Sequence, residues 1–158
     1  MVDHPVIGHV HLKVSDLERS IAFYRDVLGM ELQQMYGRGA AFLSWGGYHH
    51  HVGLNVWESR GGNAAAQGTT GLYHFAILYP SRQALAQALK RLMDKYVALD
   101  GASDHGVSEA LYLRDPDGNG VELYVDRPES EWPRVNGEIA MDSGPLDLDD
   151  LLQAAQAQ

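Results

Sequence analysis

Three residues from separate parts of the chain have side chains that could together hold a divalent metal ion. His9 and His74 each open a strand-like segment, and Glu122 interrupts the otherwise apolar run Val121–Val125. A carboxylate that points into a cavity is costly unless it is paired or bound to a metal. Two neutral imidazoles and one carboxylate form the facial triad typical of non-haem Fe(II), which leaves adjacent coordination positions open. The sequence therefore predicts a metal site formed by His9, His74 and Glu122.

The segment that begins near His9 predicts a strand, a helix and three further strands. Residues 7–14 alternate, with His9 and His11 on the face opposite the apolar residues. A capping box that starts at Ser15 predicts the beginning of a helix, and Gly29 suits the left-handed position after its end. Strand-like stretches follow near residues 30–36, 39–45 and 49–57.

After the polar, glycine-rich loop 58–71, the same order of elements starts again. A strand is expected at 72–79, a helix capped by Ser81, and strands near 97–104, 108–114 and 120–126. A shift of 65 residues places His9 on His74, and eight of nine apolar positions in the first segment stay apolar. We therefore expect an α+β fold in which two βαβββ modules form a half-open, cup-shaped β-barrel with flanking helices.

The expected domain comprises residues 1–126, with modules at about 6–57 and 72–126. The remaining residues, 127–158, form a polar, proline-containing tail in which residues 146–157 predict a short amphipathic helix. We expect this tail to pack on the domain or on a second subunit.

Composition excludes several classes of partner. The chain of 158 residues has 21 acidic and 12 basic residues, a formal net charge of −9, and no cluster of Lys and Arg. Nucleic acid and anionic membrane surfaces are therefore not expected to bind. Cysteine is absent, which excludes disulfides and thiolate metal ligands. The N-terminal segment lacks the basic and apolar regions of a signal peptide, so we expect a cytoplasmic protein.

Three stretches of the sequence resemble the vicinal oxygen chelate superfamily, which includes glyoxalase I, bleomycin-resistance proteins and type I extradiol dioxygenases. These stretches are GHVHLKVSDLERSIAFYRDVLG, LYHFAIL and LYLRDPDGNGVELY, and the similarity covers about residues 6–126. In this superfamily the metal ligands stand on the first strand of each module and on the last strand. The resemblance thus implies the same ligands, His9, His74 and Glu122.

The closest resemblance within the superfamily is to catechol 2,3-dioxygenase-like members. The stretch AFLS…HHHVGL places His50 at the position of their acid/base histidine, with its neighbour His51 as the alternative. Tyr112, ten residues before the glutamate, matches a tyrosine that contacts the substrate oxygen, and His105 matches a further active-site histidine in the preceding loop. His51, Trp57 and Tyr124 are the expected substrate contacts.

The resemblance implies an extradiol ring-cleaving dioxygenase that acts on a catechol-type diol with O2. The expected cofactor is Fe(II), with Mn(II) as the alternative because both ions share this ligand set. A homodimer is the expected assembly.

Two other functions compete with this interpretation. A glyoxalase-like isomerase usually has a glutamate or glutamine ligand on the strand near residues 50–56, where this chain has no carboxylate. A binding protein of the drug-resistance type sequesters a flat aromatic ligand without chemistry, but such members commonly lack the metal triad.

Overall fold

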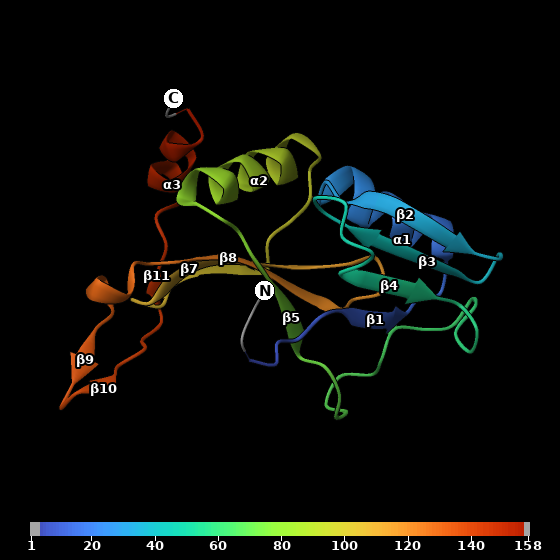
Figure 1. The fold of residues 1–158 in the computed structure, drawn as a ribbon, viewed down its shortest axis with the longest axis horizontal. Coiled ribbons are helices and arrows are strands. Elements are labelled where there is room, and N and C mark those ends of the chain that lie inside the picture. The colour runs from blue at the N-terminus through green and yellow to red at the C-terminus, as the bar shows by residue number, and fades with distance from the viewer. Residues whose placement is uncertain (1–3, 157–158) are drawn as a thin grey trace. The chain divides into compact units, whose positions relative to one another are not determined.

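The computed structural model describes residues 4–156, which divide into two compact units (Figure 1). The first unit contains the residues up to Thr70 together with the short turn Asp115–Gly118. The second unit contains Gly71–Arg114 and the chain from Asn119 onward. Each unit is described by itself below.

The first unit has one helical segment and a four-stranded sheet. Its elements are β1 (Val10–Lys13), α1 (Leu17–Ala22), the π-helical turn η1 (Phe23–Val27), β2 (Glu31–Tyr36), β3 (Ala40–Ser44) and β4 (Val52–Asn55). The strand order is β1-β4-β3-β2, with β1 parallel to β4 and the other neighbours antiparallel. Leu12 and Leu54 face the same side of this sheet and are buried, as are Leu17 and Ile21 of α1.

The start of α1 differs from the expected capping box. The cap is Asp16, whose carboxylate accepts a hydrogen bond from the Arg19 amide at 3.0 Å. Ser15 instead donates its hydroxyl to Asp117 of the Asp115–Gly118 turn at 2.6 Å. The prediction that Ser15 caps the helix is therefore wrong, because this hydroxyl is used by a turn that lies 102 residues away in sequence. Gly29 has φ +77°, as the sequence predicts for its position.

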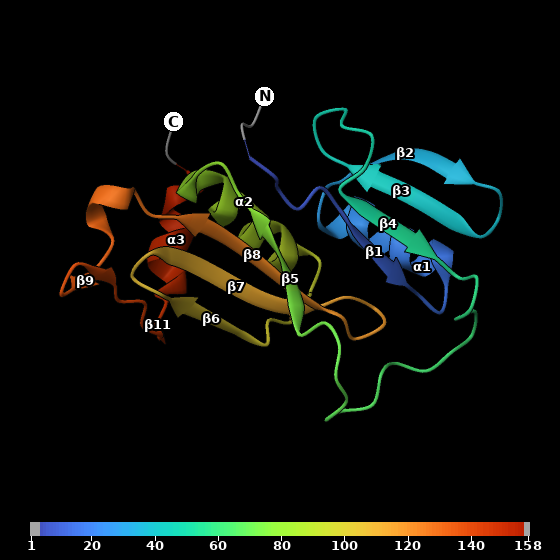
Figure 2. The ribbon, with the colours of Figure 1, turned by 60° about the horizontal axis from the view of Figure 1, so that its bottom comes forward.

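The second unit repeats this plan and adds the tail. Its elements are β5 (His74–Leu78), α2 (Arg82–Asp94), β6 (Gly101–Asp104), β7 (Ser108–Arg114), β8 (Gly120–Asp126), the 3-10 turn η2 (Glu129–Glu131), β9 (Arg134–Val135), β10 (Glu138–Ile139), β11 (Gly144–Pro145) and α3 (Leu148–Ala154). The sheet order is β11-β6-β7-β8-β5, which Figure 2 shows from a second side.

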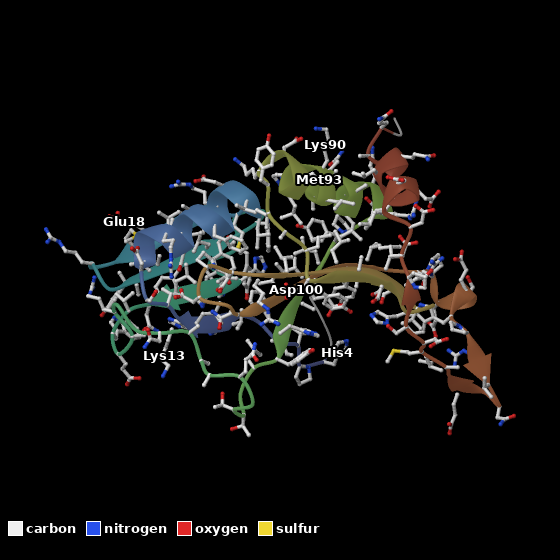
Figure 3. The ribbon with its side chains drawn as sticks, turned by 180° about the vertical axis from the view of Figure 1, so that it is seen from behind. His4, Lys13, Glu18, Lys90, Met93 and Asp100 are labelled. Carbon is white, nitrogen blue, oxygen red and sulfur yellow. The ribbon has the colours of Figure 1, made fainter. Side chains whose placement is uncertain are left out.

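Helix α2 begins where the sequence predicts and buries one face. The Ser81 hydroxyl accepts a hydrogen bond from the Ala84 amide at 3.1 Å. Leu85, Leu89 and Leu92 are buried, whereas Lys90 and Met93 are exposed on the opposite side (Figure 3). This separation of apolar and polar faces is the usual reason that such a helix packs on a sheet.

The tail packs on the second unit through α3 and β11. Arg82 pairs with Asp150 of α3 at 2.7 Å and with the buried carboxylate of Glu109 at 2.7 Å. Strand β11 extends the sheet by pairing with β6. The expected short helix is therefore present as Leu148–Ala154, and residue 157 of the predicted range lies outside the described part of the chain.

The two sheets have equivalent strand orders, since β1-β4-β3-β2 corresponds to β5-β8-β7-β6. The predicted repeat and the α+β class with mixed sheets are confirmed at this level. In the described range 4–156, neither sheet closes on itself, and no helix is long and apolar enough to span a bilayer.

Candidate functional site

In the second unit, the open face of the sheet brings His74 and Glu122 together. His74 is the first residue of β5, and Glu122 lies on the neighbouring strand β8. Their Nε2 and Oε2 atoms are 2.9 Å apart. The Glu122 side chain is only 13% exposed, so its charge depends on partners within the protein.

Tyr112 lies directly opposite Glu122 in the register of β7 and β8. Its hydroxyl oxygen is 3.3 Å from Oε1 of Glu122 and 2.7 Å from Nε2 of His105. Burial and the negative charge of Glu122 raise the pKa of Tyr112 to about 12. The phenol is therefore neutral near pH 7 and can donate one hydrogen bond.

His105 lies in the turn between β6 and β7, and its ring extends the chain of contacts. Its Nδ1 atom is 2.8 Å from the backbone carbonyl oxygen of Asp142, in the tail. A continuous series of contacts thus runs from the Asp142 carbonyl through His105, Tyr112 and Glu122 to His74. The sequence predicted the four side chains as site residues but did not predict the contribution of the tail.

A cavity of about 370 Å³ adjoins this series in the second unit. Its lining includes His74, His105 and Tyr112, together with Asp100, which pairs with Arg114 at 2.7 Å. Tyr124 lies two residues beyond Glu122 on β8, where it pairs with Leu78 and Ala110.

In the first unit, His9 packs against His50. Their ring centroids are 4.4 Å apart, and the ring of Phe42 lies 5.0 Å from that of His50. The Nδ1 atoms of His49 and His50 are 2.8 Å apart. Partial burial, and then the charge of His9, lower the pKa of His50.

The expected strand near 49–57 is shorter in the structure and does not include His50 or His51. Strand β4 begins only at Val52, which is buried in the core, so residues 46–51 do not follow the strand period. His50 instead lies beside His9, whereas His51 stacks on Tyr48 with a centroid distance of 4.6 Å. Of the two candidates, His50 is the one that contacts His9.

His11 is a polar residue of this face for which the sequence predicted no role. Its ring lies over Gly53, where an added Cβ would stand 2.9 Å from Cγ and Nδ1. The Asn55 amide donates to Nε2 of His11 at 3.1 Å, and Oδ1 of Asn55 accepts from the Trp57 amide at 3.1 Å. Trp57 is 60% exposed, with its ring 5.8 Å from that of His11. Alternation with His9 was the signal that places His11 on this face.

Each unit holds part of the predicted triad, with His9 in the first and His74 and Glu122 in the second. Within either unit taken alone, over the residues that the structure describes, no three His, Asp or Glu side chains converge to hold an ion. The donor types nevertheless suit Fe(II) or Mn(II), and the contact of an imidazole with a mostly buried carboxylate is what a shared metal would replace.

Comparison with known proteins gives a match to one family model and to several relatives. Residues 6–123 match the model of the Glyoxalase/Bleomycin resistance protein/Dioxygenase superfamily. The chain is 42% identical over 151 residues to a catechol-2,3-dioxygenase of Bacillus subtilis, a match that covers 94% of this chain and 52% of that protein. It therefore spans about half the length of that relative.

Other relatives are named for different activities. Biphenyl-2,3-diol 1,2-dioxygenase 3 of Rhodococcus globerulus is 34% identical, over 85% of this chain and 72% of that protein. A probable lactoylglutathione lyase of Synechocystis is 28% identical, over 73% of this chain and 91% of that protein. Among solved structures, a glyoxalase/dioxygenase from Nostoc punctiforme superposes with a TM-score of 0.65 at 18% identity. The match covers 78% of this chain and 92% of that chain, and it supports the fold alone.

Proposed function

Because the chain belongs to the glyoxalase/bleomycin resistance protein/dioxygenase superfamily, we propose that it is an extradiol dioxygenase that cleaves a catechol-type aromatic diol with O2. The observation that carries this proposal is the series of contacts from His74 through Glu122 and Tyr112 to His105. It combines two donors suited to a metal with a neutral hydroxyl and an imidazole within hydrogen-bond reach. Relatives with diol dioxygenase names support the same assignment.

In this proposal, His9, His74 and Glu122 hold Fe(II), or alternatively Mn(II). When bound, the ion would supply a Lewis acid that polarises the diol and O2. The reaction adds both atoms of O2 to the diol, so it needs no external reductant.

The remaining polar residues move or hold protons. We assign His50 as the base that accepts a proton from the diol, because its ring lies against the proposed ligand His9. The Tyr112 hydroxyl orients a ring oxygen of the substrate by a hydrogen bond. His105, 2.7 Å from that hydroxyl, accepts or returns a proton through it. Trp57, Tyr124 and His51 are the proposed contacts to the substrate ring.

The geometry of β4 disfavours the glyoxalase alternative. In the register of the repeat, Gly53 opposite His11 corresponds to Glu122 opposite Ala76. The ring of His11 fills the space that a side chain at Gly53 would need. Asn55, the next residue on this face, already bonds to His11 and to the Trp57 amide. We therefore propose no fourth ligand from this strand.

The test is ring cleavage by the iron-loaded protein. After anaerobic loading with Fe(II), addition of catechol and air should consume one O2 per diol and form a yellow ring-fission product. His74→Ala should abolish both signals, whereas His4→Ala should leave them unchanged. Full iron occupancy without O2 uptake for catechol and its 3- and 4-alkyl derivatives would reject the proposal, and turnover of a glutathione hemithioacetal would instead support the lyase alternative.

A further inference from the structure

Gly120, the first residue of β8, lies where the chain enters β5. It is opposite His74 in the register of these two parallel strands. A Cβ atom added to Gly120 would overlap the backbone carbonyl oxygen of Tyr73 and would stand 2.9 Å from the Cβ of His74. Atoms that are not bonded to each other repel strongly at such separations. Any side chain at position 120 would therefore force the two strands to move apart.

The backbone conformation does not explain this glycine. Gly118, in the preceding turn, has φ +82°, a conformation that favours glycine. Gly120 is not among the glycines with positive φ, and it belongs to a regular strand. A glycine inside a strand often marks a place where another backbone approaches closely. The close approach of the β5 backbone is the feature that requires a glycine here.

The space beside Gly120 is important because Glu122 stands next to it. Residues 120 and 122 are two positions apart on one strand, so they face the same side of the sheet. On this open face, Nε2 of His74 is 2.9 Å from Oε2 of Glu122. The Tyr73 carbonyl and the Cβ of His74 occupy the place of a side chain at position 120. From this place the imidazole reaches the carboxylate.

The repeat alone does not produce this close approach. His9 and His51 immediately precede the paired strands β1 and β4, so His51 corresponds to Gly120. This position in the first unit has a full imidazole ring, which stacks on Tyr48. The glycine is therefore specific to the unit in which a histidine contacts a carboxylate.

We propose that Gly120 is a positioning residue of the metal site, because its missing side chain lets the start of β5 lie against β8 and brings the His74 imidazole to Glu122. The role of His74 and Glu122 as ligands rests on the proposed function above. A side chain at position 120 would displace the histidine relative to the carboxylate on β8. The two side chains would then no longer be placed to hold one ion.

Gly120→Ala tests the proposal with the smallest possible side chain. Titration of the metal-free variant with Mn(II), followed by the electron paramagnetic resonance signal of the free ion, should give an affinity about 10- to 100-fold lower than in the wild type. Gly101→Ala, where nothing lies within 4 Å of the added Cβ, is the matched control and should bind Mn(II) as the wild type does. Wild-type affinity in Gly120→Ala would overturn the proposal.

A core variant separates positioning from a loss of stability. Leu92 is buried in α2, so Leu92→Val should destabilise the protein without altering the open face of the sheet. The folded variant should keep the wild-type affinity for Mn(II). An equal loss of affinity in Leu92→Val and Gly120→Ala would show that stability alone sets the affinity, which would contradict the proposal.

The displacement of His74 can be measured without metal or diol. In a crystal structure of metal-free Gly120→Ala, the distance from Nε2 of His74 to Oε2 of Glu122 should increase from 2.9 Å by about 1 Å or more. An unchanged distance would count against the proposal. Because this distance does not depend on turnover, failure of the ring-cleavage assay would reject the enzymatic function without changing this result.

If Gly120→Ala does not fold, a crystal structure of the wild-type protein with Mn(II) decides. The Tyr73 carbonyl should remain against Gly120 while Nε2 of His74 binds the ion. A start of β5 that has moved away from Gly120 in the Mn(II)-bound protein would refute the proposed positioning.

Discussion

Equivalent rows of residues in the two units differ in their chemistry. Across the first sheet the row is His11, Gly53 and Phe42, and across the second it is Ala76, Glu122 and Tyr112. In each unit, the first residue of the row stands two residues after the histidine that opens the module. His11 follows His9 in this way, and Ala76 follows His74. The first row has its imidazole on the outer strand and no carboxylate. The second has a small residue there, and a carboxylate and a phenol on the next two strands.

This difference indicates how a duplicated scaffold supports an asymmetric site. The repeat fixes where His9 and His74 stand, whereas the neighbouring strands decide what surrounds each imidazole. His74 faces a carboxylate at 2.9 Å, while His9 packs against another histidine ring. We infer that the second unit supplies the negative charge of the metal site and the first supplies the base.

The largest expected effect comes from removing that charge. Glu122→Gln keeps the shape of the side chain but not the carboxylate, so affinity for Fe(II) should fall at least about 100-fold, and ring cleavage with it. Iron content after gel filtration and O2 uptake measure the two effects. Glu138→Gln, on the exposed strand β10, is the matched control. A Glu122→Gln protein that retained iron and activity would remove the distinction between the two units.

Converting Tyr112 to the residue type of the first row should have the next largest effect. Tyr112→Phe removes the hydroxyl that contacts Glu122 and His105, so kcat should fall about 10- to 100-fold. Stopped-flow absorbance of the ring-fission product measures this rate. Tyr36→Phe, at an exposed tyrosine of β2, should be neutral. An unchanged kcat would show that the phenol of the second row has no role.

A strand glycine tests the steric side of the comparison. Gly53→Ala should destabilise the protein by about 1–3 kcal/mol, because the new Cβ would meet the ring of His11 at 2.9 Å. The cost should disappear in a His11→Ala background. Gly101→Ala, where nothing lies within 4 Å, should be near neutral. Urea unfolding followed by circular dichroism measures the free energy of unfolding of each variant. Equal stability of Gly53→Ala and Gly101→Ala would refute the packing argument.

The smallest effect is expected when the first row is made more like the second. Phe42→Tyr adds a hydroxyl to a partly exposed ring, so the free energy of unfolding should change by no more than about 0.5 kcal/mol. The activity should also be retained, since no carboxylate stands beside position 42. A large loss of activity in this variant would indicate that Phe42 itself contacts the substrate.

The spacing of apolar residues predicted most of the fold. Each module combines strands, in which apolar residues recur every two positions, with a helix, in which they recur about every 3.6 positions. Strands β7 and β8 begin and end where the sequence indicates, and the turn between them contains Gly118 with φ +82°. The prediction that Ser15 caps α1 was wrong because the partner of its hydroxyl, Asp117, is distant in sequence. Local patterns cannot report such a contact.

The sequence predicted contacts between residues that are opposite each other in the register of two strands. It did not predict contacts that depend on the conformation of a loop. Tyr112 and Glu122 face each other across a hairpin, so their spacing alone brings them together. His50 precedes β4, so the alternation of side chains along that strand does not fix the direction of its ring. The carbonyl of Asp142 has no side-chain signature at all, since any residue at this position offers the same acceptor.

We propose that His9 from the first unit and His74 from the second ligate the same ion. The most direct measurement is titration of the metal-free protein with Mn(II), followed by the electron paramagnetic resonance signal of the free ion. We predict one ion per chain, and an affinity at least about 100-fold lower in both His9→Ala and His74→Ala. Wild-type affinity in His9→Ala, with loss confined to His74→Ala, would contradict the account.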